Sequence, residues 1–279
     1  LFYFFSNNLT YDGRLSGFYI SPNYLAMCLS PVLILSLWLY FCLEKQLFKV
    51  FLFTGQCLLL ATVFLTYSYS AWAGLAAALL FVSVFQKLSS RNSVSGWKPS
   101  FCVLLIIISF FFSQINSPKF QELLDFSYPS LSSRLAIWQS AGEIIKDHPL
   151  NGIGPGLFQK YYLDKQTDFG LYPEWAVPQP HNLFLAFWLQ TGLIGLIGFI
   201  WLMVSFFKSG FKALFGIRHS LSAVFLMAAM VYILTHGLTD TTYWKNDLSI
   251  VFWLVLALSR NNRKKYKGSP FREIQGQPF

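Results

Sequence analysis

Runs of about 20 mostly apolar residues recur along this chain, and they limit its fold more than any other feature. A helix needs roughly 20 such residues to cross the hydrocarbon core of a bilayer, which is about 30 Å thick. Only 12% of the residues are charged, whereas soluble domains have about 25%. We therefore predict an all-α, polytopic membrane helical bundle with about seven spans, at residues 22–43, 48–66, 70–86, 100–115, 181–207, 219–239 and 244–259.

The distribution of Lys and Arg predicts the orientation of this bundle. Short cytoplasmic loops of membrane proteins are enriched in these residues. Here the C-terminal tail and the segments 44–49, 87–98 and 208–218 carry most of the 21 Lys and Arg residues. We therefore expect these segments and the C-terminus to be cytoplasmic. Because this pattern accounts for the net charge of +9, no nucleic-acid partner is needed to explain it.

The spans and their connections divide the chain into four predicted regions. A membrane region with four spans is followed by one large periplasmic loop, a membrane region with three spans, and a basic cytoplasmic tail, at residues 1–115, 116–180, 181–259 and 260–279. The first residue is Leu and no basic signal-peptide region is visible, so we expect the chain to be the C-terminal part of a longer protein.

Common catalytic and metal-binding motifs of soluble enzymes are absent from the sequence. The four cysteines all fall within apolar runs, which gives neither a disulfide framework nor metal-ligand spacing. There is no glycine-rich phosphate loop, nucleophile elbow or HExxH motif. We therefore expect no metal, and we look for chemistry among the polar groups of the outer face.

The loop at 116–180 is long enough to have structure of its own, and such loops are often functional. Within it, "SLSSRLAIWQSAGEIIKDHP" predicts an amphipathic helix that begins at Ser132 or Ser133 and ends before Pro149. Arg134 and Trp138 are one turn apart on this helix. Its predicted apolar face consists of Leu135, Ile137, Trp138, Ala141, Ile144 and Ile145.

Two glycine patterns follow the loop helix. In "NGIGPG", at 151–156, the glycines are typical either of a tight turn after a helix or of a backbone that approaches a ligand closely. In "TGLIGLIGF", Gly192, Gly195 and Gly198 recur every three residues. Small residues at this spacing let membrane helices approach closely, so we predict that this stripe packs against another span.

Three polar side chains near the ends of spans are candidates for function. His181 precedes the fifth span, where it is compatible either with a polar cap of the first turn or with a functional group. Arg14 is the only base in residues 1–21, where it suits either a lipid headgroup or a bound ligand. Asp240, after the sixth span, is interpreted as a helix-end residue that faces the outer water.

Four stretches together resemble the O-antigen ligase and polymerase superfamily of bacterial membrane glycosyltransferases. The resemblance runs from Arg14 to Leu258. It implies a helical enzyme of the GT-C kind in the bacterial inner membrane. Such an enzyme transfers an oligosaccharide from an undecaprenyl diphosphate donor to a glycan, lipid or protein acceptor, without a metal or other cofactor. The stretches are "RLSGFYISPNYLA", "SSRLAIWQSAGEIIKDHPLNGIGPGLFQKYY", "PHNLFLAFWLQTGLIGLIGF" and "HGLTDTTYWKNDLSIVFWLVLAL".

The resemblance also implies roles for individual residues. Arg134 matches a loop arginine that contacts the donor diphosphate, and His181 matches the family's histidine before Asn182. We therefore expect His181 and Arg134 to be catalytic, and Arg14, Asn182 and Trp138 to bind substrate. The sequence departs from the family pattern at two positions, where Tyr69 replaces an expected arginine and Gln190 replaces an expected acid.

The residue types suit this chemistry. A diphosphate leaving group is already charged, so arginines can stabilise its departure without a metal. A histidine at a helix N-terminus tends to stay neutral and can accept a proton from an attacking hydroxyl. The alternative is a transporter or flippase for a small solute or a lipid-linked glycan, but the spans contain almost no ionisable residues. The choice between ligase and polymerase stays open.

Overall fold

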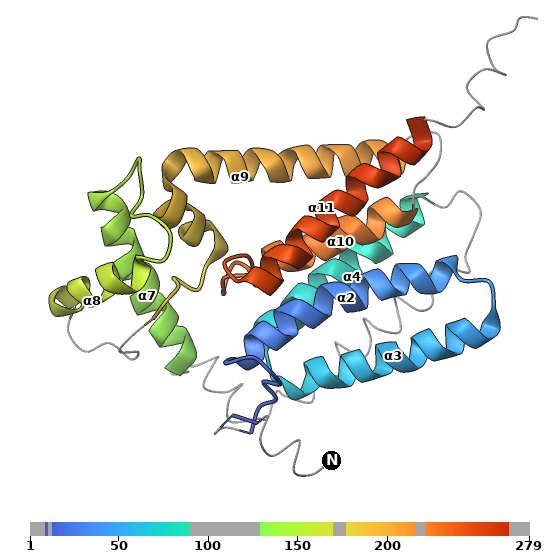
Figure 1. The fold of residues 1–279 in the computed structure, drawn as a ribbon, viewed down its shortest axis with the longest axis horizontal. Coiled ribbons are helices and arrows are strands. Elements are labelled where there is room, and N and C mark those ends of the chain that lie inside the picture. Colours follow the sequence, from blue (N-terminus) through green and yellow to red (C-terminus); the bar gives the residue numbers. More distant parts are fainter. Residues whose placement is uncertain (1–8, 11–12, 90–128, 170–176, 216–220, 268–279) are drawn as a thin grey trace, which may run out of the picture.

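The computed structural model describes residues 9–10, 13–89, 129–169, 177–215 and 221–267 (Figure 1). All the regular elements of this part are helices, which confirms the predicted all-α bundle. They are α2 (Pro22–Cys42), α3 (Gln46–Leu65), α4 (Tyr69–Ser89), α7 (Pro129–Asp147), α8 (Phe158–Phe169), α9 (Leu183–Phe215), α10 (Leu221–His236) and α11 (Asn246–Lys267). The predicted span at 100–115 lies outside the described residues.

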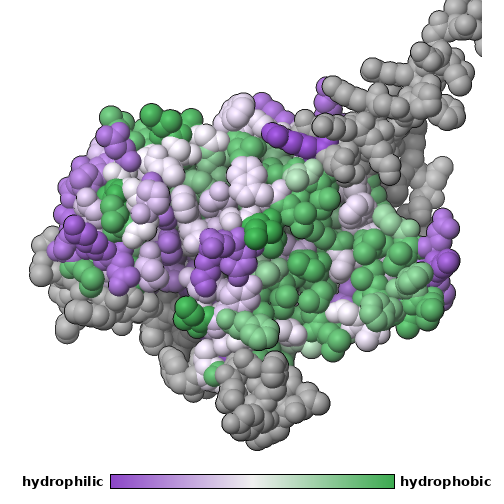
Figure 2. Space-filling view, viewed as in Figure 1, coloured by the Kyte–Doolittle hydropathy of each residue, from purple (hydrophilic) through white to green (hydrophobic). Residues whose placement is uncertain are grey.

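Six of these helices correspond to predicted spans. By length and composition α2, α3 and α9 can each cross a membrane, and α4 and α10 contain the shorter apolar stretches Tyr69–Phe85 and Leu221–His236. α11 continues to Lys267, beyond the predicted end of its span, so helix replaces the first part of the predicted tail. Figure 2 shows apolar residues gathered over α2, α3 and α11.

α10 forms the centre of the bundle. Most of its residues are buried, and they pack against α2, α4, α9 and α11 in one apolar core. A helix that is apolar on all sides is expected to be buried in this way. By contrast, α3 packs mainly on α2, with Phe64 also against Trp72 of α4, and leaves large side chains such as Leu47, Phe51 and Leu58 exposed, as expected of a helix that faces lipid.

α7 and α8 form a separate unit beside the bundle, against the first turns of α9 (Figure 1). The predicted apolar face is largely correct, because Ile137, Ala141 and Ile144 are fully buried. Leu135 was wrongly included, since it is 50% exposed. The predicted start was also wrong, because the helix already includes Pro129, and Ser132 and Ser133 lie inside it.

α9 contains a sharp bend at Gly192, visible in Figure 1 as a short segment followed by a long one. Gly192 has φ 71° and ψ −178°, a conformation that is essentially restricted to glycine. The "NGIGPG" turn docks here: Ile153 N–H donates to the Leu189 carbonyl at 2.6 Å, and Leu193 N–H donates to the Leu150 carbonyl at 3.0 Å. Gly152, Gly154 and Gly156 all have positive φ, so they shape the turn that packs on the bend. The two hydrogen bonds satisfy backbone groups that the interrupted helix leaves open.

The predicted packing of the glycine stripe against another span is wrong. Gly198 is exposed, and no atom from elsewhere in the described residues would lie within 4 Å of a Cβ added there. The three atoms nearest to a Cβ on Gly195 would all belong to the side chain of Thr191 from its own helix. Only Gly192 has a close backbone neighbour, the loop at Leu150. The period of three residues therefore does not mark a helix interface here.

We predict opposite effects of the same substitution at two of these glycines. Gly192→Ala should destabilise the protein by at least about 1–3 kcal/mol, because a side chain is strained at this φ and would collide with the Leu150 carbonyl. Gly198→Ala should be neutral or stabilise by up to about 1 kcal/mol, since it is a helical glycine in open space. Thermal unfolding in detergent measures the stability of both variants. Equal melting temperatures for Gly192→Ala and Gly198→Ala would contradict the conformation described at Gly192.

Candidate functional site

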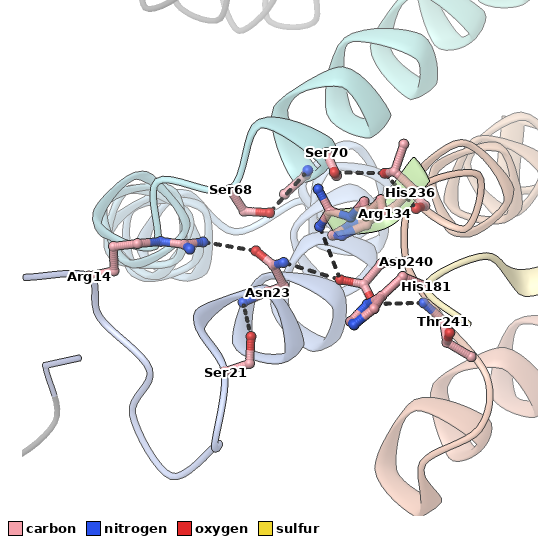
Figure 3. Close-up of polar contacts among 12 residues, drawn as sticks. Arg14, Ser21, Asn23, Ser68, Ser70, Arg134, His181, His236, Asp240 and Thr241 are labelled. Atoms are coloured by element: carbon pink, nitrogen blue, oxygen red, sulfur yellow. Dashed lines mark hydrogen bonds and ion pairs between the residues drawn. The ribbon is translucent and has the colours of Figure 1, made fainter. Parts of the chain in front are cut away.

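Polar side chains from four distant parts of the chain converge at one end of the bundle (Figure 3). This is the end where α2 and α4 begin and where α10 ends. α2 contributes Asn23, α7 contributes Arg134, the segment before α9 contributes His181, and the turn after α10 contributes Asp240. We call Asn23, Arg134, His181 and Asp240 the Asp240 cluster.

Asp240 is the centre of this cluster, and the prediction that it faces the outer water was wrong. Its side chain is only 2% exposed. One carboxylate oxygen, Oδ1, accepts from the Thr241 N–H at 2.8 Å and lies 3.0 Å from Nδ1 of His181. The other, Oδ2, accepts from the Asn23 amide at 3.1 Å and lies 3.9 Å from a guanidinium nitrogen of Arg134.

These contacts decide the charge of Asp240. Burial raises the pKa of its carboxyl, but the neighbouring His181 and Arg134 lower it by more, so the pKa lies below its usual value. The group is therefore an anion at neutral pH. A buried carboxylate of this kind is stable only where charged or hydrogen-bonding partners surround it, which is what the cluster supplies.

His181 is held in place from both sides of its backbone. It has a positive φ of 44°, which is uncommon for a residue other than glycine. Its carbonyl accepts a hydrogen bond from the Trp138 indole at 3.2 Å. The next residue, Asn182, caps α9 by accepting from the N–H groups of Phe184 and Leu185 at 2.9 and 3.0 Å. Trp138 and Asn182, predicted to bind substrate, thus fix the orientation of His181 in this structure.

Arg134 has donors left over after its contact with Asp240. Its side chain is 15% exposed, and the ion pair uses one terminal nitrogen. Its Nε atom is buried and has no hydrogen-bond partner among the described residues. A guanidinium in this state can still bind two oxygens of a phosphate group.

A second histidine lies behind the cluster. His236 is fully buried, and its Nδ1 lies 2.8 Å from the Tyr232 hydroxyl, which in turn donates to the Ala26 carbonyl at 3.0 Å. The direction of the Tyr232–His236 hydrogen bond depends on the tautomer of His236. Nε2 of His236 has no partner within the part of the chain that the structure describes.

Arg14 belongs to the same end of the bundle but supports the cluster indirectly. Its Nε donates to the Thr66 carbonyl at the end of α3 at 2.8 Å, and a terminal nitrogen donates to Oδ1 of Asn23 at 2.9 Å. Asn23 then donates to Asp240. Arg14 therefore orients Asn23, and through it the carboxylate.

The two positions that depart from the family pattern lie around this site. Tyr69 is the first residue of α4, next to Ser70, whose hydroxyl accepts from Thr239 at 2.7 Å. Gln190 joins two loops: its amide donates to Gln179 at 2.9 Å, and its oxygen accepts from the Gly156 N–H at 3.3 Å. A glutamine makes both kinds of contact, whereas an ionised acid could only accept.

Asp240, Asn23 and His236 were not predicted as site residues. Asp240 and His236 both stand in "HGLTDTTYW", and Asn23 follows Pro22 in "SPNYLA", so all three lie in stretches that carry the family resemblance. Within the described residues, no group of three or more His, Cys, Asp or Glu side chains is arranged to hold a metal ion.

The fold and the cluster together define an integral membrane protein with a buried ionic site at one end of its helices. The chain belongs to the O-antigen ligase family, whose model matches residues 55–200, just over half of the sequence. This match includes Arg134 and His181, while Asn23 and Asp240 lie outside it. No curated protein matches the chain. The family indicates a glycosyltransferase-like enzyme of the O-antigen ligase or polymerase type that takes part in polysaccharide biosynthesis.

Proposed function

We propose that this protein transfers an oligosaccharide from undecaprenyl diphosphate to an acceptor on the outer face of the bacterial inner membrane. The observation that carries the proposal is the buried Asp240 carboxylate, which contacts His181 on one oxygen and lies close to Arg134 on the other. This arrangement supports the proposal because it puts a residue able to act as a base and a residue able to bind phosphate on the two oxygens of one carboxylate, which suits glycosyl transfer from a diphosphate.

In this mechanism His181 acts as the general base. Because its Nδ1 faces the Asp240 carboxylate, the favoured tautomer carries the proton on Nδ1 and leaves Nε2 basic. Nε2 accepts the proton of the acceptor hydroxyl while that oxygen forms a bond to the anomeric carbon of the donor sugar. Asp240 then stabilises the imidazolium through the same hydrogen bond.

The bond that breaks joins the anomeric carbon to the donor diphosphate. Its electron pair leaves on the diphosphate oxygen, so negative charge grows there in the transition state. The Arg134 donors that Asp240 leaves available are suited to bind these oxygens and to stabilise this charge. The diphosphate departs as a stable anion, which requires no further protonation and no metal.

We expect Arg134→Lys to lower the transfer rate by roughly 10- to 100-fold although the positive charge remains. Lysine cannot present two parallel N–H donors to a phosphate. Arg134→Ala should be slower still. Rates are measured at equal amounts of inserted protein, and a lysine variant as fast as the wild type would show that the two-pronged contact is not used.

The sidedness of the site follows from the charge pattern. The Asp240 cluster lies at the end of the bundle opposite to the exposed bases Lys45, Lys208 and Lys212. If these bases are cytoplasmic, then the cluster, α7 and α8 face the periplasm. We therefore propose the topology predicted from the sequence, which consists of two membrane regions, the periplasmic loop between them and a cytoplasmic C-terminus.

This topology predicts opposite labelling of two exposed positions. Lys160 lies on α8, and Arg260 lies near the other end of the bundle on α11. In a background without the native cysteines, Lys160→Cys should react with a membrane-impermeant thiol reagent in cells stripped of their outer barrier. Arg260→Cys should react only after lysis. The reverse pattern would place the cluster on the cytoplasmic side.

Deletion of the gene distinguishes a transferase from a flippase. A transferase acts after the donor has crossed the membrane, so its loss should leave the lipid-linked glycan accessible to a glycosidase added from the periplasmic side. Loss of a flippase would instead leave the glycan protected until lysis. An exposed donor that disappears when the wild-type gene is restored, but not when the His181→Ala gene is restored, supports the proposal.

A further inference from the structure

A cavity of about 580 Å³ lies between α9 and α11, separate from the Asp240 cluster. Phe206 and Trp253 are among the apolar residues that line it. Its polar residues are three serines and one arginine, Ser205, Ser209, Ser259 and Arg260. The described residues that line the cavity thus include one cation and no acid.

The position of these residues along their helices gives the depth of the cavity in the membrane. At 1.5 Å per residue, Arg260 lies about 21 Å along α11 from Asn246. Ser209 lies about 25 Å along α9 from the bend at Gly192. Because Asn246 and Gly192 are near the end of the bundle that carries the Asp240 cluster, the arginine and Ser209 lie in the opposite half of the bilayer, close to its surface.

The charge around the cavity is positive. Arg260 on α11 is exposed, as are Lys208 and Lys212 on α9. After Arg260, the sequence of α11 continues as "NNRKKYK". A basic surface at this depth attracts the anionic headgroups of the nearby leaflet. The guanidinium can bind two phosphate oxygens, and serine hydroxyls can donate to the same group.

The size and the walls of the cavity indicate which ligand fits. Ligand cavities are commonly about 300–1,000 Å³, so this one has room for a glycerophosphate headgroup and the first part of an acyl chain. The apolar walls suit that chain, and the absence of an acid among the described lining residues favours a headgroup with net negative charge over a zwitterionic one. A lipid bound here would contact α9 and α11 at once.

We propose that the α9–α11 cavity is a binding site for an anionic phospholipid of the phosphatidylglycerol type, held by Arg260 and the three serines. The site is independent of the proposed glycan transfer, since it shares no residue with the Asp240 cluster. Its lipid links the two helices, so the site couples the stability of the bundle to the composition of the leaflet.

The test uses the full protein in a mild detergent with phosphatidylglycerol or phosphatidylcholine of identical acyl chains. Native mass spectrometry should detect one retained phosphatidylglycerol, and this lipid should raise the melting temperature while phosphatidylcholine does not. Arg260→Gln should weaken the apparent affinity about 10- to 100-fold, because a charge-assisted phosphate contact is lost. Ser209→Leu should also weaken binding, since it fills the polar end of the cavity.

Lys45→Gln is the matched control, because it removes one exposed positive charge at the start of α3, outside the lining of the cavity and away from α9 and α11. It should leave phosphatidylglycerol binding unchanged, and inorganic phosphate alone should not raise the melting temperature. The proposal is overturned if the two lipids bind equally or not at all. It is also overturned if Lys45→Gln and Arg260→Gln have the same effect, or if phosphate alone reproduces the stabilisation.

Discussion

Replacing His181 by alanine is expected to lower the rate of glycan transfer by about 10²- to 10⁴-fold, the usual effect of losing a general base. The imidazole lies 3.0 Å from the Asp240 carboxylate, so its removal also takes away the group that this carboxylate orients. The side chain is 24% exposed and sits outside the apolar core, so the variant should insert and fold. The measurement is the initial rate of transfer at equal protein in the membrane.

His148→Ala is a matched control for this variant. His148 belongs to the turn after α7, where its ring packs edge-on against Tyr161. The substitution likewise removes an imidazole near the end of a helix but does not touch the Asp240 cluster, so the rate should stay close to that of the wild type. Equal rates for His181→Ala and the wild type, or equal losses in the two variants, would contradict the role assigned to His181.

The second large effect is expected for Asp240→Asn. Asparagine keeps the shape of aspartate but presents an amide in place of an anion, so it no longer specifies which nitrogen of His181 carries the proton. It also leaves Arg134 without its buried counter-charge. Loss of the carboxylate from a comparable acid–histidine pair lowers kcat by up to about 10⁴-fold, and we expect a loss of the same order.

The pH dependence separates the roles of the two residues. Because the pKa of Asp240 lies below its usual value, its contribution to stability is complete at neutral pH and is lost only as the pH falls through that lowered pKa. Above about pH 5, Asp240 therefore stays ionised, and any acid limb of kcat/KM belongs to another group. Asp164→Asn on α8, an exposed position, is the control and should change neither the rate nor the pH profile.

The outcome for Asp240→Asn that contradicts this account is specific. A variant that keeps the wild-type rate and pH profile would show that the carboxylate does not orient the base. A variant that fails to fold is distinguished by its melting temperature in detergent. In that case Asn23→Ala provides a milder test, because it removes only one hydrogen bond to Asp240 and should lower the rate by a smaller factor.

The sequence predicts the helices well where burial in lipid alone decides their position. The apolar runs that became α2, α3 and α9 were found within a few residues at their starts, because a span needs a minimum apolar length. The start of α7 was missed because serine is a common N-cap, whereas Pro129 also suits the first turn of a helix. Gly192, Gly195 and Gly198 are equally spaced in the sequence, but of the three Gly192 alone packs closely against the loop at Leu150. Their spacing could not predict this difference, because it depends on where the loop docks.

The site was predictable only in part. Arg134 and His181 stand in stretches that resemble the family, and the structure brings both to Asp240. The prediction that Asp240 faces water was wrong because an acid after a span is normally solvated, whereas this one is buried. Its burial depends on the approach of α2 and α7, which no local pattern encodes. The structure also shows that Trp138 and Asn182 hold the backbone around His181.

The most direct test of the account is transfer by the purified protein in proteoliposomes. The donor is an undecaprenyl diphosphate oligosaccharide, the acceptor is supplied on the same side, and both the glycan product and free undecaprenyl diphosphate are measured in the presence of a metal chelator. We predict that the two products form in equal amounts with the wild type, and at least about 100-fold more slowly with His181→Ala. Donor that crosses the bilayer without release of undecaprenyl diphosphate, or transfer that His181→Ala leaves unchanged, would contradict it.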